Sequence, residues 1–102
     1  MDLIDTDTEG SFFNVIAGTD RSQAAMLVLE AGQSTGGPTN QHPKADQWVY
    51  VKAGTGEAIV EEDRYPLDRG DLLLIEAGEC HEIIAGEQAA LETVTIYAPP
   101  EY

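Results

Sequence analysis

Apolar and polar residues alternate in short stretches along most of the chain, and glycine, proline, aspartate or asparagine separates one stretch from the next. Alternation at every second residue is typical of half-buried β-strands, whereas an amphipathic helix repeats its apolar residues every three or four positions. No stretch has the pattern of a long helix. The alternation predicts eight strands, at residues 12–16, 23–30, 47–52, 57–62, 64–67, 72–75, 81–84 and 91–97.

Residues suited to tight turns lie between these predicted strands, for example at Ala17-Gly18-Thr19-Asp20, Gly54-Thr55-Gly56 and Arg69-Gly70-Asp71. Several short strands at this spacing indicate a β-sandwich or a small β-barrel, and not an alternation of strands and helices. The chain has 102 residues, which is the usual size of one domain. We therefore expect an all-β protein in which residues 1–102 form a single domain.

The composition is that of an ordinary folded domain except for its charge. Nineteen acidic and five basic side chains give a net charge of −14. Because the five basic residues are scattered, binding to nucleic acid through its phosphates is not expected. The acidity is typical of a well solvated surface, and a cation-binding surface or a high-salt environment would also account for it.

Two further observations concern location and redox chemistry. No apolar run approaches the roughly 20 residues that a membrane-spanning helix needs, and the start MDLIDTDTEG is acidic where a secretory signal is basic and then apolar. We therefore expect a cytoplasmic protein without a membrane partner. Cys80 is the only cysteine, which excludes an intrachain disulfide and a multi-cysteine zinc site. A small buried hydrophobic role is favoured for Cys80 over that of a reactive thiol.

The two histidines of the chain each lie where a loop runs into a predicted strand. His42 lies in the turn-rich loop of Gly36 to Gly56, at a spacing that could bring its side chain together with those of Asn40 and Gln47, and His81 begins a strand downstream. A shared polar site is the favoured interpretation of this arrangement. The alternative for Asn40 and Gln47 is a hydrogen-bonding role that fixes the loop or the histidines.

Alternation also assigns the two faces of the predicted strand at residues 47–52. If Gln47 points into a barrel, Val49 and Val51 line the interior below it, and Trp48 and Tyr50 lie on the outer face. Aromatic side chains on the outside of a small barrel are often covered by a second subunit. The sequence thus favours a homodimer. We expect the apolar residues Phe12, Phe13, Met26, Leu27 and Leu29 to belong to the core, and not to contact a ligand.

Both loop-to-strand passages resemble the motifs of the cupin family. The first family motif has a His-x-His pair, three or four residues, Glu, six residues and Gly. Counting back from Gly54 places Gln47 at the acidic position, His42 at the second histidine and Asn40 at the first. The motif can also be aligned from a glycine that precedes the histidine pair. Counting forward from Gly36 would make His42 the first histidine and would put Lys44, a charged side chain, at the position of the second.

The second family motif, Gly-x5-Pro-x-Gly-x2-His-x3-Asn, matches Gly70, Gly78 and His81, while Glu76 stands in place of the proline and Ala85 in place of the asparagine. The resemblance covers about residues 22–98. It implies a double-stranded β-helix, or jelly-roll, barrel. Cupins commonly bind one divalent metal through three histidines and a glutamate.

Carried onto this chain, the resemblance implies a divalent transition metal held by His42, Gln47, His81 and Asn40. Amide oxygens are weaker neutral donors than imidazole or carboxylate, so we expect weaker metal binding than in a site with three histidines and a glutamate. Three functions remain open: a metal-dependent enzyme acting on a small oxygen-rich substrate, a non-catalytic module that binds a small molecule, and a structural or regulatory dimer whose metal site has degenerated.

Overall fold

The computed structural model describes residues 1–7, 12–36 and 43–102. Within these ranges the chain forms eight strands and no helix, and each strand lies within two residues of its predicted bounds. The all-β prediction is confirmed. The strands are β1 (Phe13–Gly18), β2 (Gln23–Leu29), β3 (Asp46–Ala53), β4 (Gly56–Val60), β5 (Asp63–Leu67), β6 (Leu72–Ile75), β7 (His81–Ala85) and β8 (Leu91–Ala98).

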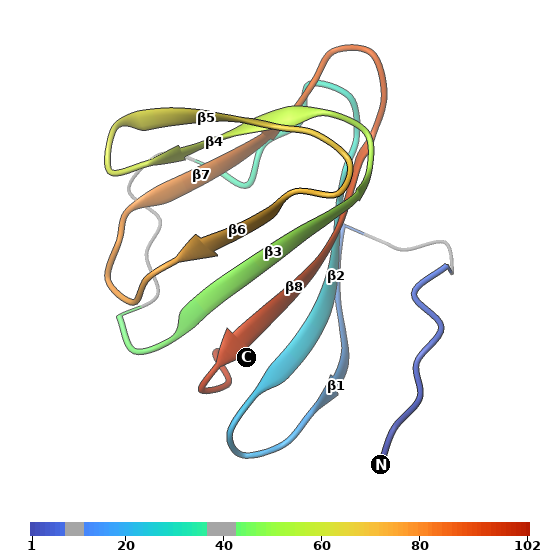
Figure 1. Cartoon of the computed structure of the whole chain (residues 1–102), viewed down its shortest axis with the longest axis vertical. Helices are drawn as coiled ribbons and strands as arrows, with labels where there is room; N and C mark the ends of the chain where they lie inside the picture. Colours follow the sequence, from blue (N-terminus) through green and yellow to red (C-terminus); the bar gives the residue numbers. More distant parts are fainter. Residues whose placement is uncertain (8–11, 37–42) are drawn as a thin grey trace.

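The described strands are arranged in two antiparallel sheets (Figure 1). One sheet has five strands in the order β1-β2-β8-β3-β6, and the other has three in the order β5-β4-β7. Strand β8 pairs with both β2 and β3, so the last strand of the chain joins two earlier ones. Consecutive strands are therefore often not neighbours, as expected of a jelly roll.

The alternation predicted from the sequence separates the interior from the surface. In β3, Gln47, Val49 and Val51 are buried, while Trp48 and Tyr50 are 40% and 45% exposed. Strands β7 and β8 alternate buried and half-buried side chains in the same way. The apolar core between the strands consists of Leu27, Leu29, Val49, Val51, Ala58, Val60, Leu67, Ile75, Ile83, Ala85 and Leu91.

The hairpin between β4 and β5 corrects one predicted boundary. The predicted strand ran to Glu62, but β4 ends at Val60. Glu61 and Glu62 have φ angles of 48° and 75°, in the left-handed region. A two-residue hairpin with this backbone matches the twist of the flanking strands, even though asparagine and glycine adopt it at lower cost than glutamate does. Turn geometry thus overrides residue preference here.

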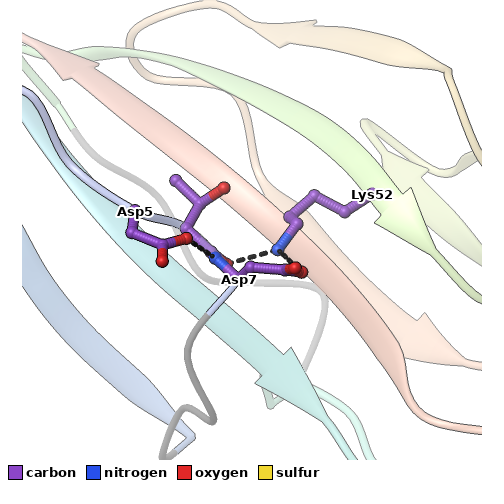
Figure 2. A network of polar contacts seen from close by, with 4 residues as sticks. Asp5, Asp7 and Lys52 are labelled. Atoms are coloured by element: carbon purple, nitrogen blue, oxygen red, sulfur yellow. Dashed lines mark hydrogen bonds and ion pairs between the residues drawn. The ribbon is translucent and has the colours of Figure 1, made fainter.

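The N-terminal segment, residues 1–7, forms no strand and is tied to β3 through Lys52 (Figure 2). The Lys52 ammonium donates a hydrogen bond to the Thr6 carbonyl and lies 3.8 Å from Asp7 Oδ1. The Asp7 amide donates to Asp5 Oδ1 at 2.9 Å, which gives the segment a local turn. One of the few cations of this chain is thus used to hold an acidic terminus.

Two expected burial states are wrong. Cys80 is only partly buried, because it precedes β7 on the face opposite to that of His81 and Ile83. Phe12 is 45% exposed, because it lies just before β1 at the edge of the five-stranded sheet. Among the residues that the structure describes, no helix is long and apolar enough to span a membrane.

Candidate functional site

A cavity of about 490 Å³ lies between the two sheets. Most of its wall is apolar and comes from Phe12, Phe13, Leu27, Ile83, Tyr97 and Tyr102. Its polar lining comes from Thr35, Gln47, His81 and Glu101. A volume of this order and a mostly apolar wall with a few polar groups are typical of small-molecule sites.

Gln47 belongs to a row of paired residues across the five-stranded sheet, in which Gln23 pairs with Tyr97, Tyr97 with Gln47, and Gln47 with Ile75. The Gln47 side chain is 3% exposed. Its Nε2 donates to Thr95 Oγ1 at 3.0 Å. Within the described part of the chain, its Oε1 has no hydrogen-bond partner. A buried acceptor in that state costs about 1–3 kcal/mol, so this oxygen is a candidate contact for a ligand.

His81 faces the cavity from the other sheet. It begins β7, is 5% exposed and pairs with Val60 of β4. Its Nδ1 lies 3.2 Å from the Glu79 carbonyl oxygen. Because a carbonyl oxygen only accepts, Nδ1 is the donor in this contact, and in the neutral ring Nε2 then carries the lone pair. His81 can therefore offer a nitrogen acceptor to the same cavity as Gln47.

The other two predicted site residues, Asn40 and His42, lie outside the described residues. Their meeting with Gln47 and His81 stays a prediction. On the upstream side of that segment, Thr35 is held against β7, since the Thr35 amide donates to the Ile83 carbonyl at 2.9 Å and Thr35 Oγ1 accepts from the Ile83 amide at 3.0 Å. Thr35 and Gln47, on either side of the segment in sequence, both line the cavity.

The C-terminal residues form part of the cavity wall because Gln23 holds them there. Gln23 Nε2 donates to the Tyr102 carbonyl at 2.6 Å, and Gln23 Oε1 accepts from the amides of Tyr102 and Glu101 at 3.0 and 3.3 Å. After β8 the chain turns back in this way below the end of the strand (Figure 1). Glu101 and Tyr102 are thereby placed at the cavity.

Three aromatic rings pack together on this side of the cavity. The ring centroids of Phe13 and Tyr102 are 4.9 Å apart, those of Tyr97 and Tyr102 are 5.3 Å apart, and those of Phe13 and Tyr97 are 6.5 Å apart. Burial raises the pKa of the Tyr97 phenol well above its usual range, and Tyr102 and Glu101 act in the same direction. Tyr97 is thus a neutral phenol at physiological pH.

These positions decide what the described residues can bind. Gln47 Oε1 supplies a neutral acceptor, which suits a hydrogen bond from a small molecule, and the His81 ring lines the same cavity. Across residues 1–7, 12–36 and 43–102, no three His, Cys, Asp or Glu side chains come together in a way that could hold an ion. The described side chains therefore do not make a metal centre by themselves, and the metal set implied by the cupin resemblance depends on Asn40 and His42.

Sequence reasoning missed several residues of the site. Thr95 is fully buried, and its Oγ1 donates to the Trp48 carbonyl at 3.1 Å while it receives the Gln47 amide. Phe13 packs against the core as expected, but it also lines the cavity. The signal for Thr95 was a threonine at an inward position of β8, since a buried hydroxyl needs a partner. No local signal indicated that Gln23 holds the C-terminal residues.

Comparisons with known proteins support the fold. Comparison with curated protein sequences gave no significant match. The protein BH2720 from Bacillus halodurans superposes with a TM-score of 0.88 at 23% identity, over 95% of this chain and 76% of that one. KdgF from Halomonas sp. gives a TM-score of 0.78 at 25% identity, over 86% and 77% of the two chains.

A protein with a double-stranded β-helix domain from Klebsiella pneumoniae gives a TM-score of 0.85 at 19% identity, over 97% of this chain and 90% of that chain. The predicted double-stranded β-helix barrel is confirmed. Residues 25–97 match the sequence family described as the cupin domain. Because that match extends over most of the sequence, the chain belongs to the cupin family.

Proposed function

We propose that the chain is a binding protein for a small organic molecule, which occupies the cavity between the sheets. The observation that carries the proposal is that Gln47 and His81, from opposite sheets, are both buried and both line one mostly apolar cavity. A buried acceptor without a partner is stabilised by a ligand that donates to it. Cupins as a family bind small-molecule substrates, which agrees with this assignment.

A fragment screen by saturation-transfer difference NMR tests the proposal. We expect fragments that bind the wild-type chain to lose binding in Gln47→Ala and in His81→Ala. Gln88→Ala is the matched control, because Gln88 is an exposed amide in the turn between β7 and β8. Fragments that bind all three variants as they bind the wild type would show that the cavity is not the binding site.

A metal-dependent enzyme is the second candidate. The contact between His81 Nδ1 and the Glu79 carbonyl favours it, because metal-binding histidines commonly donate their other ring N–H to such an oxygen. His42, Gln47, His81 and Asn40 would hold the divalent ion. Such an ion would polarise an oxygen atom of the substrate.

Metal analysis of protein purified without a nickel column separates the two candidates. Stoichiometric iron, manganese or another transition metal, lost in both His42→Ala and His81→Ala, supports the enzyme. Fragment binding that persists after dialysis against EDTA supports direct binding to the side chains. Unchanged metal content in both histidine variants would show that the proposed metal ligands are wrong.

We also propose that the chain is a homodimer through the outer face of β3 and β6. Trp48 pairs with Leu74, and Tyr50 with Leu72, so the four exposed side chains form two adjacent cross-strand pairs. An exposed apolar cluster of this kind is commonly covered by a partner. The net charge of −14 on each copy opposes association, and the apolar contact has to exceed that repulsion.

Light scattering after gel filtration measures the oligomer. The wild type should have twice the 11.0 kDa of one chain, and Trp48→Glu should shift it toward the monomer. Tyr65→Glu is the control, since Tyr65 is 44% exposed on β5 of the other sheet. A monomeric wild type at high micromolar concentration would rule out the dimer.

A further inference from the structure

We propose that the cavity selects small, mostly apolar, ring-sized molecules that carry a hydroxyl or an ammonium group, and that it rejects their carboxylate analogues. Gln47 is the residue that sets this specificity, and Thr95 is the residue that positions it. The inference rests on the proposed binding function and gives the chemical class of its ligand.

The orientation of the Gln47 amide follows from the hydrogen bonds of Thr95. A threonine hydroxyl has one proton and two lone pairs. When the Thr95 hydroxyl donates to the Trp48 carbonyl, 3.1 Å away, its Oγ1 accepts from Gln47 Nε2 at 3.0 Å. The Tyr97 phenol is also hydrogen-bonded to Thr95. Turning the amide over would bring two oxygens together without a proton between them. Thr95 thus fixes Nε2 as the bonded end of the amide and Oε1 as the remaining end.

This orientation makes Gln47 a neutral acceptor for a ligand. Oε1 is buried and has no hydrogen-bond partner in the described part of the chain. A hydroxyl or an ammonium group of the ligand can donate to Gln47 Oε1. A carboxylate has no proton to donate, so it would place its own oxygen against Oε1, and it would also lose its hydration on entering the cavity. A site that is built to receive a donor rejects analogues without one, because its buried polar group is then left unpaired.

The charge of the molecule acts in the same direction. Glu101 lines the cavity, and the whole chain carries −14. Both repel an anionic ligand and attract a cationic one. Two effects therefore disfavour carboxylates: the unpaired acceptor of Gln47 inside the cavity, and the negative electrostatic potential of the whole protein.

The apolar wall determines the body of the ligand. Phe13, Tyr97 and Tyr102 present packed aromatic rings, and Leu27 and Ile83 line the same cavity. Aromatic side chains favour offset or edge-to-face contacts with another ring. A single aromatic or alicyclic ring with one polar substituent fits this division of the cavity between apolar wall and polar groups.

Three probes that share one ring test the inference: benzyl alcohol, benzylamine and benzoate. Titrations of the full chain are followed by ¹H–¹⁵N NMR in EDTA, so that a stray metal ion cannot bind the carboxylate. We expect benzyl alcohol and benzylamine to bind at least about tenfold more tightly than benzoate. Benzoate that binds equally or more tightly would overturn the inference and leave the proposed binding function intact. Failure of all three probes to bind would contradict both.

Variants at Thr95 test whether this residue positions Gln47. The quantity measured is the ratio of the affinities for benzyl alcohol and benzoate, which the loss of a merely structural residue would not change. Thr95→Val removes the hydroxyl with little change of shape and frees the Gln47 amide to turn over, so the preference for benzyl alcohol over benzoate should fall at least about threefold. Thr95→Ser keeps the hydroxyl and should keep the wild-type ratio. If Thr95→Val keeps the ratio while remaining folded, Thr95 does not orient Gln47, and that part of the inference is wrong.

Discussion

At the scale of single residues, the interior of this barrel depends on a few buried polar groups whose partners are far away in sequence. Thr93 Oγ1 donates to the Leu27 carbonyl at 2.8 Å, and Thr95 bridges Gln47 and the Trp48 carbonyl. Each threonine is fully buried. A buried hydroxyl is tolerated only when it is paired, so these two residues fix the positions of their partners as well as their own.

Tyr97 gives a prediction for alkaline pH. Its folded pKa is raised by burial, so at high pH the unfolded chain loses the phenol proton before the folded chain does. The stabilising effect is complete below the unfolded value of about 10 and is lost as pH rises above it, with a slope of at most about 1.4 kcal/mol per pH unit. Urea denaturation of the wild type between pH 9 and about 11.5 should show this loss, and Tyr97→Phe should show a smaller one.

The exposed residue Tyr65 supplies the control for this measurement. Tyr65→Phe removes the same hydroxyl group from an exposed position on β5, so the loss of stability at high pH should be smaller in Tyr97→Phe than in Tyr65→Phe. Identical pH slopes for the wild type and Tyr97→Phe would contradict the assignment of the effect to Tyr97.

At the scale of elements, the turn between β3 and β4 is constrained more tightly than other turns with similar backbone angles. Gly54 has a φ of +86°, and a Cβ atom there would overlap the Ala90 carbonyl oxygen. Gly70 has a φ of +94°, but a Cβ atom there would meet nothing within 4 Å. Gly54, from which the first cupin motif was counted, is thus needed for two reasons. It adopts the left-handed backbone angle, and it allows the β3–β4 turn to approach the loop that contains Ala90.

Alanine substitution at the two glycines separates strain from steric overlap. Gly70→Ala should lower the free energy of unfolding by about 1 kcal/mol, the usual cost of a side chain in the left-handed region. Gly54→Ala adds the overlap with the Ala90 backbone, which cannot move aside easily, and should cost about 3 kcal/mol or more. Chemical denaturation measures both values. Equal costs at the two positions would show that the loops near Gly54 and Ala90 do not approach each other as described.

At the scale of the whole molecule, the charge of −14 is an opposing term in folding. Like charges are closer together in the folded chain than in the unfolded one, and salt screens them once the Debye length falls to about 10 Å or less. Raising sodium chloride from about 0.02 to about 0.5 M should therefore stabilise the chain by about 1 kcal/mol, which corresponds to roughly 4–8 °C in Tm.

A variant of the β4–β5 hairpin provides the control for the salt effect. Glu61 and Glu62 lie at the exposed tip, and changing both to glutamine keeps the size of the side chains while it lowers the net charge from −14 to −12. The variant should respond less to salt than the wild type. A Tm of the wild type that does not depend on salt would show that surface repulsion is not a significant term.

Much of the fold could be predicted from the sequence because strand alternation is a local property. Alternation along β3 put Gln47 on one face with Val49 and Val51 and put Trp48 on the other, and this follows from the order of residues alone. The same reasoning placed His81 and Ile83 on one face of β7. The motif spacings that resemble those of cupins also indicated the family.

The sequence by itself thus determined the strands, their faces and the two inward polar residues, Gln47 and His81. Only the tertiary structure decided that Gln23 holds the backbone of Tyr102, 79 residues away, and that Thr95 orients Gln47 across neighbouring strands. The physical reason is that the face on which a side chain lies depends on adjacent residues. The partner of a buried polar atom, by contrast, depends on which distant strands are paired and in what register.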